Sequence, residues 1–431
     1  MRTRSEKIER QNQRGMTLIF VAVSLAVLLS LMAFAIDLAW LYVAHVEAQN
    51  VADAAALAAA RGIVASGYTT VQNNDFLGIA GTLSTNLAQS EGNAVGGQYT
   101  IVGIAPTVTV NAPDYSTPNN PQVSVSVSAA VPTFFIKAVS SSFTTVTIRT
   151  SATAAVYNPG NAASGVSVVG TKPWMVPNID PNYLCVLGVS GNCNCTTPAG
   201  NAPFINNTNG KICNPGVTLF AAGGEVGSQL NLTAGDPTVV PVPGNFYQYS
   251  PALLASGTAS NVPACGTGLS AYQQAIAGLF TAPIVTGTNY TVDPVTPDLA
   301  STQTAIQCLI HESGGTGQDT MNFTLVGALS LWPTGGNNNP LPSARGNGLS
   351  RSDSIVTFPI YDVGAGALTA PCPAGACSNL PVIGFLQVFI DGAPNGAVPF
   401  QATIQNVVGA LSSANPIITP AGSPVPVRLV Q

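Results

Sequence analysis

Residues 16–36 have the sequence MTLIFVAVSLAVLLSLMAFAI, a run of 21 residues without a charged side chain. The hydrocarbon core of a bilayer is about 30 Å thick, and an α-helix crosses it in roughly 20 residues. A single segment satisfies its own backbone hydrogen bonds in lipid only as a helix. The sequence therefore predicts a transmembrane helix over residues 16–36.

The helix is expected to continue beyond the membrane. Asp37 ends the apolar run, and Trp40 and Tyr42 follow where aromatic side chains commonly lie at the membrane interface. No proline or glycine occurs between these residues and Gly62, and alanine, leucine, glutamine and glutamate, which favour helices, are abundant. We predict that residues 37–66 are an exported continuation of the helix, with Gly62 as its first candidate stop.

Charge predicts the orientation of the span. Five of the chain's 13 basic residues precede it, at Arg2, Arg4, Lys7, Arg10 and Arg14. Cationic flanks stay in the cytoplasm, so residues 1–15 are predicted to be a cytoplasmic tail and the rest of the chain to be exported in a single pass. A cleaved signal peptide is the alternative, and residues 33–35 (AFA) have the pattern of its cleavage site. The length of the apolar run and its unbroken continuation favour an uncleaved anchor.

Composition indicates an exported protein. Charged residues make up 7% of the 431 residues, against about 25% in typical soluble domains, while Gly (43) and Pro (33) are abundant. Five of 13 basic and two of 18 acidic residues precede the span, which leaves 8 basic and 16 acidic residues and a net charge of −8. This acidic balance argues against nucleic-acid binding.

Eight cysteines lie in the exported part, an even number that predicts disulfides in an oxidising compartment. They are Cys185, Cys193, Cys195, Cys213, Cys265, Cys308, Cys372 and Cys377. Eight cysteines allow 105 connectivities, so the sequence does not determine the pairing. Proximity favours Cys372 with Cys377 and a cluster among the first four, which leaves Cys265 with Cys308. Zinc binding is disfavoured, because no CxxC pair occurs and His311 is the only histidine downstream of the anchor helix.

Residues 67–157 are predicted to form a small α+β domain. Alternating valines and polar residues are typical of strands, and in the stretch 122–129 the valines are expected to face a core and the serines water. The expected elements are a helix over 76–89, strands over 107–110, 122–129 and 144–157, and a short helix over 132–139. Residues 158–170, rich in Gly, Asn, Ala and Ser, are interpreted as a linker.

Residues 171–431 are predicted to form a larger β-rich, cysteine-containing extracytoplasmic domain. Its expected strands cover 217–221, 239–242, 323–331, 355–361, 382–390 and 401–408, and its expected helices cover 270–280 and 298–311. Ser270 is a candidate N-cap for the first of these helices. The overall fold class is α+β or mainly β: a long transmembrane helix, a small antiparallel sheet and a disulfide-containing β-rich domain.

Sequence motifs of catalysis are missing. No G-x-S-x-G or phosphate-loop motif occurs, and His311-Glu312 lacks the second histidine of a zinc protease because Gly315 stands there. We therefore expect no catalytic residue, no cofactor, no metal, no small-molecule substrate and no enzyme activity. A secreted hydrolase that uses His311 as its base is the alternative.

Residues 36–44 (IDLAWLYVA) and 47–60 (EAQNVADAAALAAA) resemble the N-terminal segment of TadG-like proteins of the Flp (tight adherence) pilus-assembly system. Residues 130–135 (AVPTFF) and 151–156 (SATAAV) resemble the first exported domain of the same family. The resemblance covers roughly a third of the chain, and a helix carrying a small sheet is also the layout of pilin-like proteins. It implies a single-pass envelope protein of the bacterial inner membrane, whose partners are other pilus-assembly proteins or pilin-like subunits.

The sequence departs from related patterns at two places. The Asp-x-Ser-x-Ser segment of a metal-dependent adhesion domain is missing, since Asp353-Ser354-Ile355 breaks it. Gly15-Met16 resembles a prepilin peptidase site, but Phe20 occupies the position where pilins usually carry glutamate. These departures favour a stationary anchor or scaffold. The alternative is a processed minor pilin or a secreted surface adhesin.

Small side chains mark one face of the exported helix and predict close packing against another element. The alanines between Ala52 and Ala59 form most of this face. Two partners remain open: the protein's own domain, or helices of other proteins in an assembly.

The disulfide hypothesis predicts that thiol labelling of the exported protein without reductant finds almost no free cysteine. Labelling after reduction in denaturant serves as the control and should find eight thiols. Eight thiols labelled before reduction would contradict both the disulfides and the export.

Overall fold

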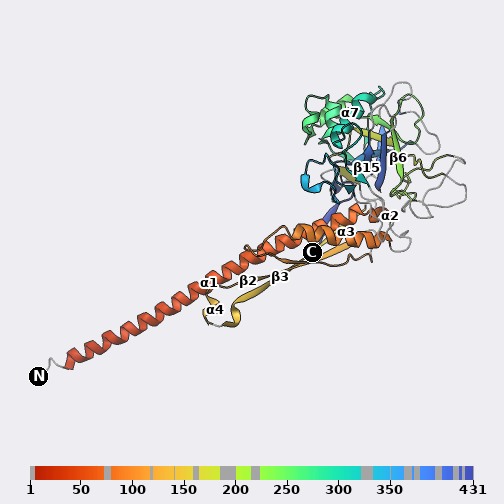
Figure 1. Ribbon diagram of the computed structural model, residues 1–431. Coiled ribbons are helices and arrows are strands. Elements are labelled where there is room, and N and C mark those ends of the chain that lie inside the picture. Colours follow the sequence, from red (N-terminus) through yellow and green to blue (C-terminus); the bar gives the residue numbers. More distant parts are fainter. Residues whose placement is uncertain are drawn as a thin grey trace.

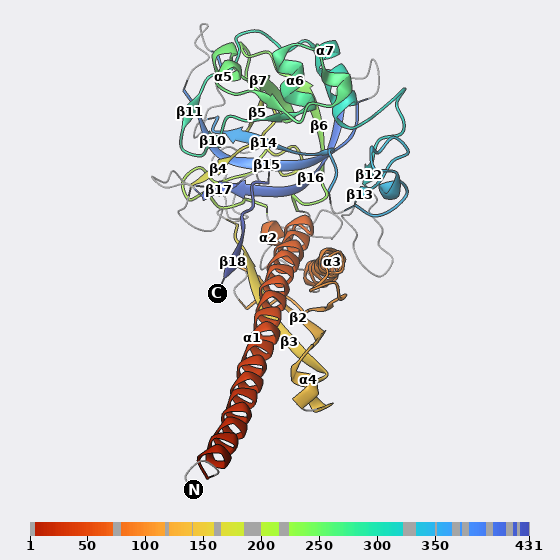
Figure 2. The same cartoon turned by 90° about the vertical axis from the view of Figure 1, so that its left-hand side faces the viewer.

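The structure is a computed structural model, which describes residues 5–71, 79–116, 120–139, 141–158, 165–184, 200–214, 224–321, 333–349, 351–363, 371–372, 379–393, 400–410, 417–419 and 423–430. A long helix, α1, dominates its shape (Figure 1). The N-terminal half of α1 stands alone, whereas the C-terminal half lies against a small sheet and leads into a β-rich part. The view in Figure 2 shows the same arrangement from the side.

Helix α1 (Ser5–Ala65) is continuous, and at 1.5 Å per residue it is roughly 90 Å long. The continuous helix predicted through the apolar run and beyond it is present. Gly62, the stop that the sequence predicts, does not end the helix. The chain turns two residues after Ala65, at Gly67, whose φ of 71° lies in the left-handed region.

Helix α3 (Ile79–Gly96) packs against the C-terminal half of α1. A Cβ atom at Gly62 would lie 2.6 Å from the carbonyl carbon of Leu87, and one at Gly92 would lie 3.1 Å from the Cβ of Ala59. Later residues of α1 thus meet earlier residues of α3, so the two helices are antiparallel. Gly62 is needed because the backbone of α3 passes too close for a side chain.

A four-stranded antiparallel sheet covers another side of α1 in the order β1-β2-β3-β18. Its strands are β1 (Thr107–Val110), β2 (Gln122–Pro132), β3 (Thr145–Val156) and β18 (Val427–Val430). Val123, Val125 and Val127 are buried, as their alternation with serine predicts. The predicted helix over 132–139 is shorter: β2 runs to Pro132, and α4 covers Ile136–Val139.

The last described strand of the chain completes this first sheet. In β18, Val427 lies opposite Val156 of β3, and Val430 lies opposite Thr153. The C-terminal end of the chain therefore belongs to the sheet that residues 107–156 begin. Local sequence patterns do not predict a pairing between segments so far apart.

Six strands of the remaining chain close into a ring. They are β5 (Trp174–Pro177), β6 (Gln229–Ala234), β7 (Asn245–Gln248), β14 (Ile355–Tyr361), β15 (Leu380–Gly392) and β16 (Phe400–Gly409). The order β15-β14-β5-β7-β6-β16 closes because β16 pairs again with β15, and β11 (Asn289–Tyr290) adds to the end of β15. Closure leaves these strands no free edge along their paired segments.

Trp174 lies at the centre of the core within this ring. Its ring centroid is 5.0 Å from that of Phe246, 5.3 Å from that of Phe358 and 5.8 Å from that of Phe400. The indole Nε1 donates a hydrogen bond of 2.7 Å to the hydroxyl of Tyr272, so the buried polar atom is satisfied. Apolar side chains that alternate along all six strands complete this core.

Two capped helices pack on the same core. Helix α6 (Ala271–Ala277) begins after Ser270, whose hydroxyl accepts a bond from the backbone N–H of Gln273. Helix α7 (Leu299–Leu309) begins after Asp298, whose carboxylate accepts one from the backbone N–H of Ser301 at 2.8 Å. Both helices begin where the sequence predicts, but they end at Ala277 and Leu309, before the predicted ends at residues 280 and 311.

The other described elements are short. The helices are α2 (Tyr68–Val71) and α5 (Pro251–Ser256), with 3-10 turns at Ser141–Phe143, Ala264–Gly266 and Pro342–Ala344. The strands are β4 (Val166–Val168), β8 (Ala259–Ser260), β9 (Leu279–Phe280), β10 (Ile284–Val285), β12 (Thr320–Met321), β13 (Pro333–Thr334) and β17 (Ile417–Thr419).

Several predicted elements differ from the structure. The strand over 239–242 is wrong: Val239 is 51% exposed and lies in a turn, because the prolines nearby cannot donate to a ladder. Residues 158–170, interpreted as a linker, include the buried strand β4, which pairs with β10 and β17. The strands predicted over 217–221 and 323–331 lie outside the described residues.

Buried hydrogen bonds join the end of α1 to the ring of strands. The hydroxyl of Thr70 donates to Oδ1 of Asn406 in β16 (3.1 Å), and Nδ2 of Asn406 donates to the carbonyl of Val64 (3.2 Å). Asn158, which lies just after β3 of the first sheet, donates to the carbonyl of Thr69 (2.9 Å) and so ties the same segment to that sheet. One hydrophobic cluster also runs from α1 to residues of β14 and β15. The helix is thus attached to the β-rich part through a shared core.

We predict that Gly62→Val lowers the thermal unfolding temperature of the detergent-solubilised protein, since the new side chain overlaps the backbone of α3. Such overpacking costs about 1–3 kcal/mol. Asn93→Val places the same side chain on the exposed face of α3, and its effect should stay within about 0.5 kcal/mol. Equal losses in the two variants would contradict the close helix contact.

Candidate functional site: a membrane anchor

The apolar half of α1 is bare in the described structure. From Leu18 to Ile36 its large hydrophobic side chains are all exposed, between 51% and 71%. Among the described residues α1 is the one helix long and apolar enough to cross a membrane, with a mean hydropathy of 2.8 over its most apolar window. Water is a poor solvent for a continuous apolar surface of this size, whereas a bilayer matches it in length and chemistry.

The hydroxyl groups within this segment are satisfied by the helix itself. Ser24 donates to the carbonyl of Val21 at 2.9 Å, and Ser30 donates to the carbonyl of Ala26 at 2.8 Å. Serine side chains bond in this way to the preceding turn. Because these two serines need no outside partner, they do not prevent the segment from lying in lipid.

Asp37 marks the end of the bare segment and contacts the β2–β3 hairpin. It is 1% exposed, and its carboxylate accepts bonds from the backbone N–H groups of Phe134 (2.9 Å), Phe135 (2.9 Å) and Ile136 (2.6 Å). Figure 1 shows the position of this contact, where α4 lies beside α1 at the end of the hairpin nearest the bare segment.

The hairpin amides determine the charge state of Asp37. Burial by itself raises the pKa of the carboxyl group, but the three N–H donors and the nearby Lys137 lower it, and the net pKa of Asp37 lies below its usual value. The carboxylate is therefore the stable form. A carboxylate with three backbone donors is a charge-assisted contact, stronger than a bond between neutral groups.

The three residues predicted at the membrane interface have different surroundings. Tyr42 is 69% exposed, Trp40 is half-buried with its ring centroid 5.4 Å from that of Phe134, and Asp37 is buried. The sequence placed all three at the interface but did not reveal the partner of Asp37. The N–H groups that bind Asp37 belong to Phe134, Phe135 and Ile136, within residues 132–139, for which the sequence predicts a short helix.

The alanine face of α1 packs inside the protein itself. Most alanines of this face are fully buried within the described structure, together with the chain's own α3 and first sheet: Ala44, Ala48, Ala52, Ala55, Ala56, Ala59 and Ala60. Of the two partners left open by the sequence, the protein's own domain is the one observed. Glu47 adds a polar contact by accepting the N–H of Val102 at 2.6 Å.

The candidate processing site lies inside a helix. Gly15 and Met16 are within α1, which starts at Ser5, and their side chains are outside the described structure. The uncleaved anchor stays a prediction, and cleavage after Gly15 stays its alternative.

One disulfide is described completely. Cys265 bonds to Cys308 and ties the turn at 264–266 to α7. Cys213 and Cys372 are buried and also disulfide-bonded. The other four cysteines, Cys185, Cys193, Cys195 and Cys377, lie outside the described residues.

Elsewhere in the described residues, titratable side chains include a surface pair and a buried pair. The Nε2 atom of His311 lies 3.0 Å from the carboxylate of Asp353, which is 63% exposed to solvent. Glu225 is buried, and burial together with the neighbouring Asp180 carboxylate raises the pKa of Glu225 well above its usual value, which favours the neutral acid. No group of three His, Cys, Asp or Glu side chains within the described ranges could hold a metal ion.

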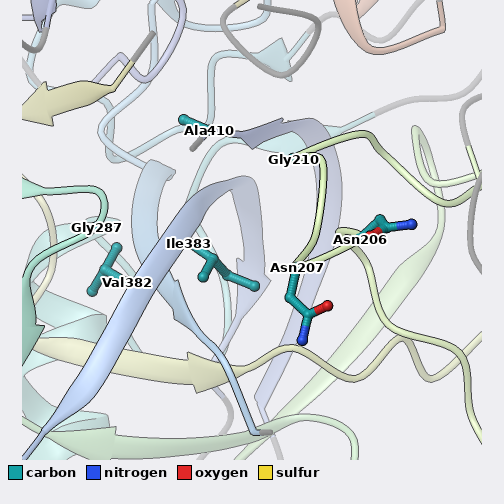
Figure 3. A pocket seen from close by; sticks show the side chains of 7 residues that line it. All are labelled: Asn206, Asn207, Gly210, Gly287, Val382, Ile383 and Ala410. Carbon is teal, nitrogen blue, oxygen red and sulfur yellow. The ribbon is translucent and has the colours of Figure 1, made fainter. Parts of the chain in front are cut away.

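A cavity of about 240 Å³ lies beside β15 (Figure 3). Its lining consists of neutral residues: Asn206, Asn207, Gly210, Gly287, Val382, Ile383 and Ala410. The amide of Asn207 donates to the carboxylate of Asp362 at 3.1 Å. This lining supplies neither an acid–base pair nor a nucleophile, so the anchor helix, not the cavity, is the candidate functional site.

The fold and site define a class of protein with one membrane-compatible helix that continues into an attached β-rich region. Residues 15–62 match the model of the Tad family, described as "Putative Flp pilus-assembly TadE/G-like". The matched segment includes both the bare half of α1 and its buried alanine face. No curated protein and no solved structure matches the chain significantly.

The N-terminal helix is thus a TadE/G-like segment, as the resemblance in its sequence implied, and the match links the chain to Flp pilus assembly. The matched residues end near the end of α1, so the match does not describe the sheet or the ring of strands. The small sheet is observed, but no comparison identifies it as a pilin domain.

We predict that Asp37→Ala releases the hairpin from α1, because the three amides lose their acceptor. Hydrogen exchange at Phe134, Phe135 and Ile136 should then become as fast as in an open loop. Asp53→Ala is the control, since Asp53 lies on the same helix and bonds to Gln49, and should leave this exchange unchanged.

The same contact has a defined pH dependence. Because the folded-state pKa of Asp37 lies below its usual value of 3.8, its contribution to stability is complete above that value and is lost as the pH falls through the lowered pKa. Loss of protection already at neutral pH in the wild type would contradict the contact.

Proposed function

We propose that the protein is a non-enzymatic, single-pass membrane anchor or scaffold of Flp-type pilus assembly in the bacterial inner membrane. The observation that carries this proposal is the change along α1: the large apolar side chains of the unbroken helix are exposed from Leu18 to Ile36, Asp37 binds the hairpin, and from Ala44 onward one face of the helix is buried in the protein's own fold. The first sheet is therefore attached to the helix directly at the end of the span, and the β-rich part is attached to the far end of the same helix.

Charge supports the orientation. The basic residues before the span favour a cytoplasmic N-terminus, and the remaining residues carry a net charge of −8, with 8 basic against 16 acidic side chains. The β-rich part then lies outside the cytoplasm, where the disulfide between Cys265 and Cys308 is stable.

The packing of α1 restricts how the protein can contact its partners. Its alanine face is occupied by α3 and the first sheet, so helices of other proteins cannot use that face without unfolding the domain. Partner contacts of the exported part are therefore assigned to the surfaces of the sheet and the β-rich region. Within the membrane, the bare half of α1 remains available to other helices.

A processed minor pilin or a secreted adhesin is the alternative function. In α1, the first half is exposed and apolar, and the second half packs on an antiparallel sheet, a layout that favours the pilin form. Gly15-Met16 offers a cleavage site. Phe20 opposes it, because pilins usually carry glutamate at this position and Phe20 offers no charge for a partner in a filament.

The test is the intact mass and N-terminal sequence of the protein from membrane and culture fractions. We expect a membrane species that is full length or lacks only Met1 and that resists extraction at alkaline pH. A start at Met16 would contradict the stationary anchor and support the pilin, and a start near Ile36 would indicate a secreted protein. Gly15→Leu, which blocks a prepilin site, is the control and should leave the mass unchanged except for the substitution.

A further inference from the structure

We propose that the tip of the β2–β3 hairpin, residues 133–139 and 141–144, is a second membrane contact that lies in the phospholipid headgroup layer beside α1. This proposal rests on the membrane-anchor function proposed for α1. It adds a lipid-binding surface outside the helix and assigns the hairpin tip a role in fixing the depth and tilt of the exported part.

The first argument is depth. The headgroup layers extend a bilayer from about 30 Å to about 40–45 Å, so each layer is roughly 5–7 Å thick. At 1.5 Å per residue this distance corresponds to roughly four helical residues beyond Ile36. Asp37 is the first of them, and it binds the N–H groups of Phe134, Phe135 and Ile136. The contact therefore holds the hairpin tip at headgroup depth.

The second argument is exposure. Phe134 is 47% exposed, Phe135 45% and Phe143 53%. Outside the predicted span, all exposed phenylalanines of the described residues lie on this tip. Aromatic side chains are enriched at membrane interfaces. Three of them lie on one hairpin tip, which the bonds to Asp37 hold next to the exposed apolar half of α1.

The third argument is charge. Lys137 is exposed and is the only charged residue between Pro132 and Arg149, and the rest of the tip is apolar or carries neutral hydroxyl groups. A single cation beside exposed phenylalanines suits a layer of anionic phosphates above acyl chains. The exported part as a whole is acidic, so the composition of the tip differs from that of its surroundings.

Hydrogen bonds and one ring contact hold the tip in place. The N–H of Thr133 donates to the carbonyl of Thr144 at 3.2 Å, and the hydroxyl of Thr133 donates to the carbonyl of Phe143. The ring of Phe134 also contacts that of Trp40, with 5.4 Å between centroids. These contacts fix the backbone on both sides of the tip and hold Phe134 against α1, while parts of all three phenylalanine rings stay exposed.

The experiment uses the full chain in nanodiscs that hold one copy each and contain phosphatidylcholine and phosphatidylglycerol. Phe135→Trp adds a fluorophore at the tip, and its emission is taken as the difference from the wild type. Lipids brominated close to the headgroup end of the acyl chain are the quencher. Tyr99→Trp is the matched control, because Tyr99 is an exposed aromatic residue just after α3, whose end at Gly96 packs against Ala55 of α1, far along the helix from Asp37 and the hairpin tip.

We expect a blue shift and the loss of most of the added emission for Phe135→Trp in brominated nanodiscs, and no loss for Tyr99→Trp. Quenching of the residue 135 emission by aqueous iodide, and not by the brominated lipids, would overturn the proposal. Emission shielded from both quenchers would also overturn it, as expected if another protein surface covers the tip.

Leu28→Trp separates this proposal from the anchor function. Position 28 lies in the middle of the predicted span, so its emission should be lost in nanodiscs brominated near the ends of the acyl chains. If Leu28→Trp is quenched and Phe135→Trp is not, the anchor stands and the hairpin contact fails. If neither is quenched, both proposals fail.

Discussion

The contact between the Asp37 carboxylate and three backbone N–H groups of the hairpin connects the two halves of this protein. Before Asp37 the helix has the surface of a membrane span, and from Ala44 onward one face of the same helix forms part of a folded core. A buried carboxylate must be paired, because removing a charge from water without partners is costly. Here the hairpin provides those partners, so the sheet begins where the span ends and the lowered pKa keeps the group ionised.

Close packing of small residues makes the exported half of the helix part of the fold. The alanines of α1 and the glycines at positions 62 and 92 bring the backbone of α3 to a distance that larger side chains would prevent. Hydrogen bonds from Thr70 and from Asn406 of β16 then join this unit to the ring of strands. Because β18 also returns to the first sheet, both ends of the β-rich region are attached to the unit built on the anchor helix.

The ring of strands closes on itself, whereas the first sheet, among the described strands, is open at β1 and β18. A sheet without free edges along its paired segments needs no charged residues there to prevent association with other sheets. Its core is organised by Trp174 and surrounding phenylalanines, and the indole N–H is satisfied by Tyr272. The result is a region held by packing and disulfides and solvated by neutral polar residues, which is consistent with the envelope location proposed for it.

The sequence alone determined the long helix, the strands around Val123–Val127 and at 355–361, and the starts of the helices at Ser270 and Asp298, since periodicity and capping are local properties. It also identified the TadE/G-like segment. Only the tertiary structure decided that Asp37 binds the hairpin, that the alanine face packs on its own domain, and that β18 joins the first sheet. These features depend on contacts between residues far apart in the chain, and the residue pattern on either side is compatible with more than one partner.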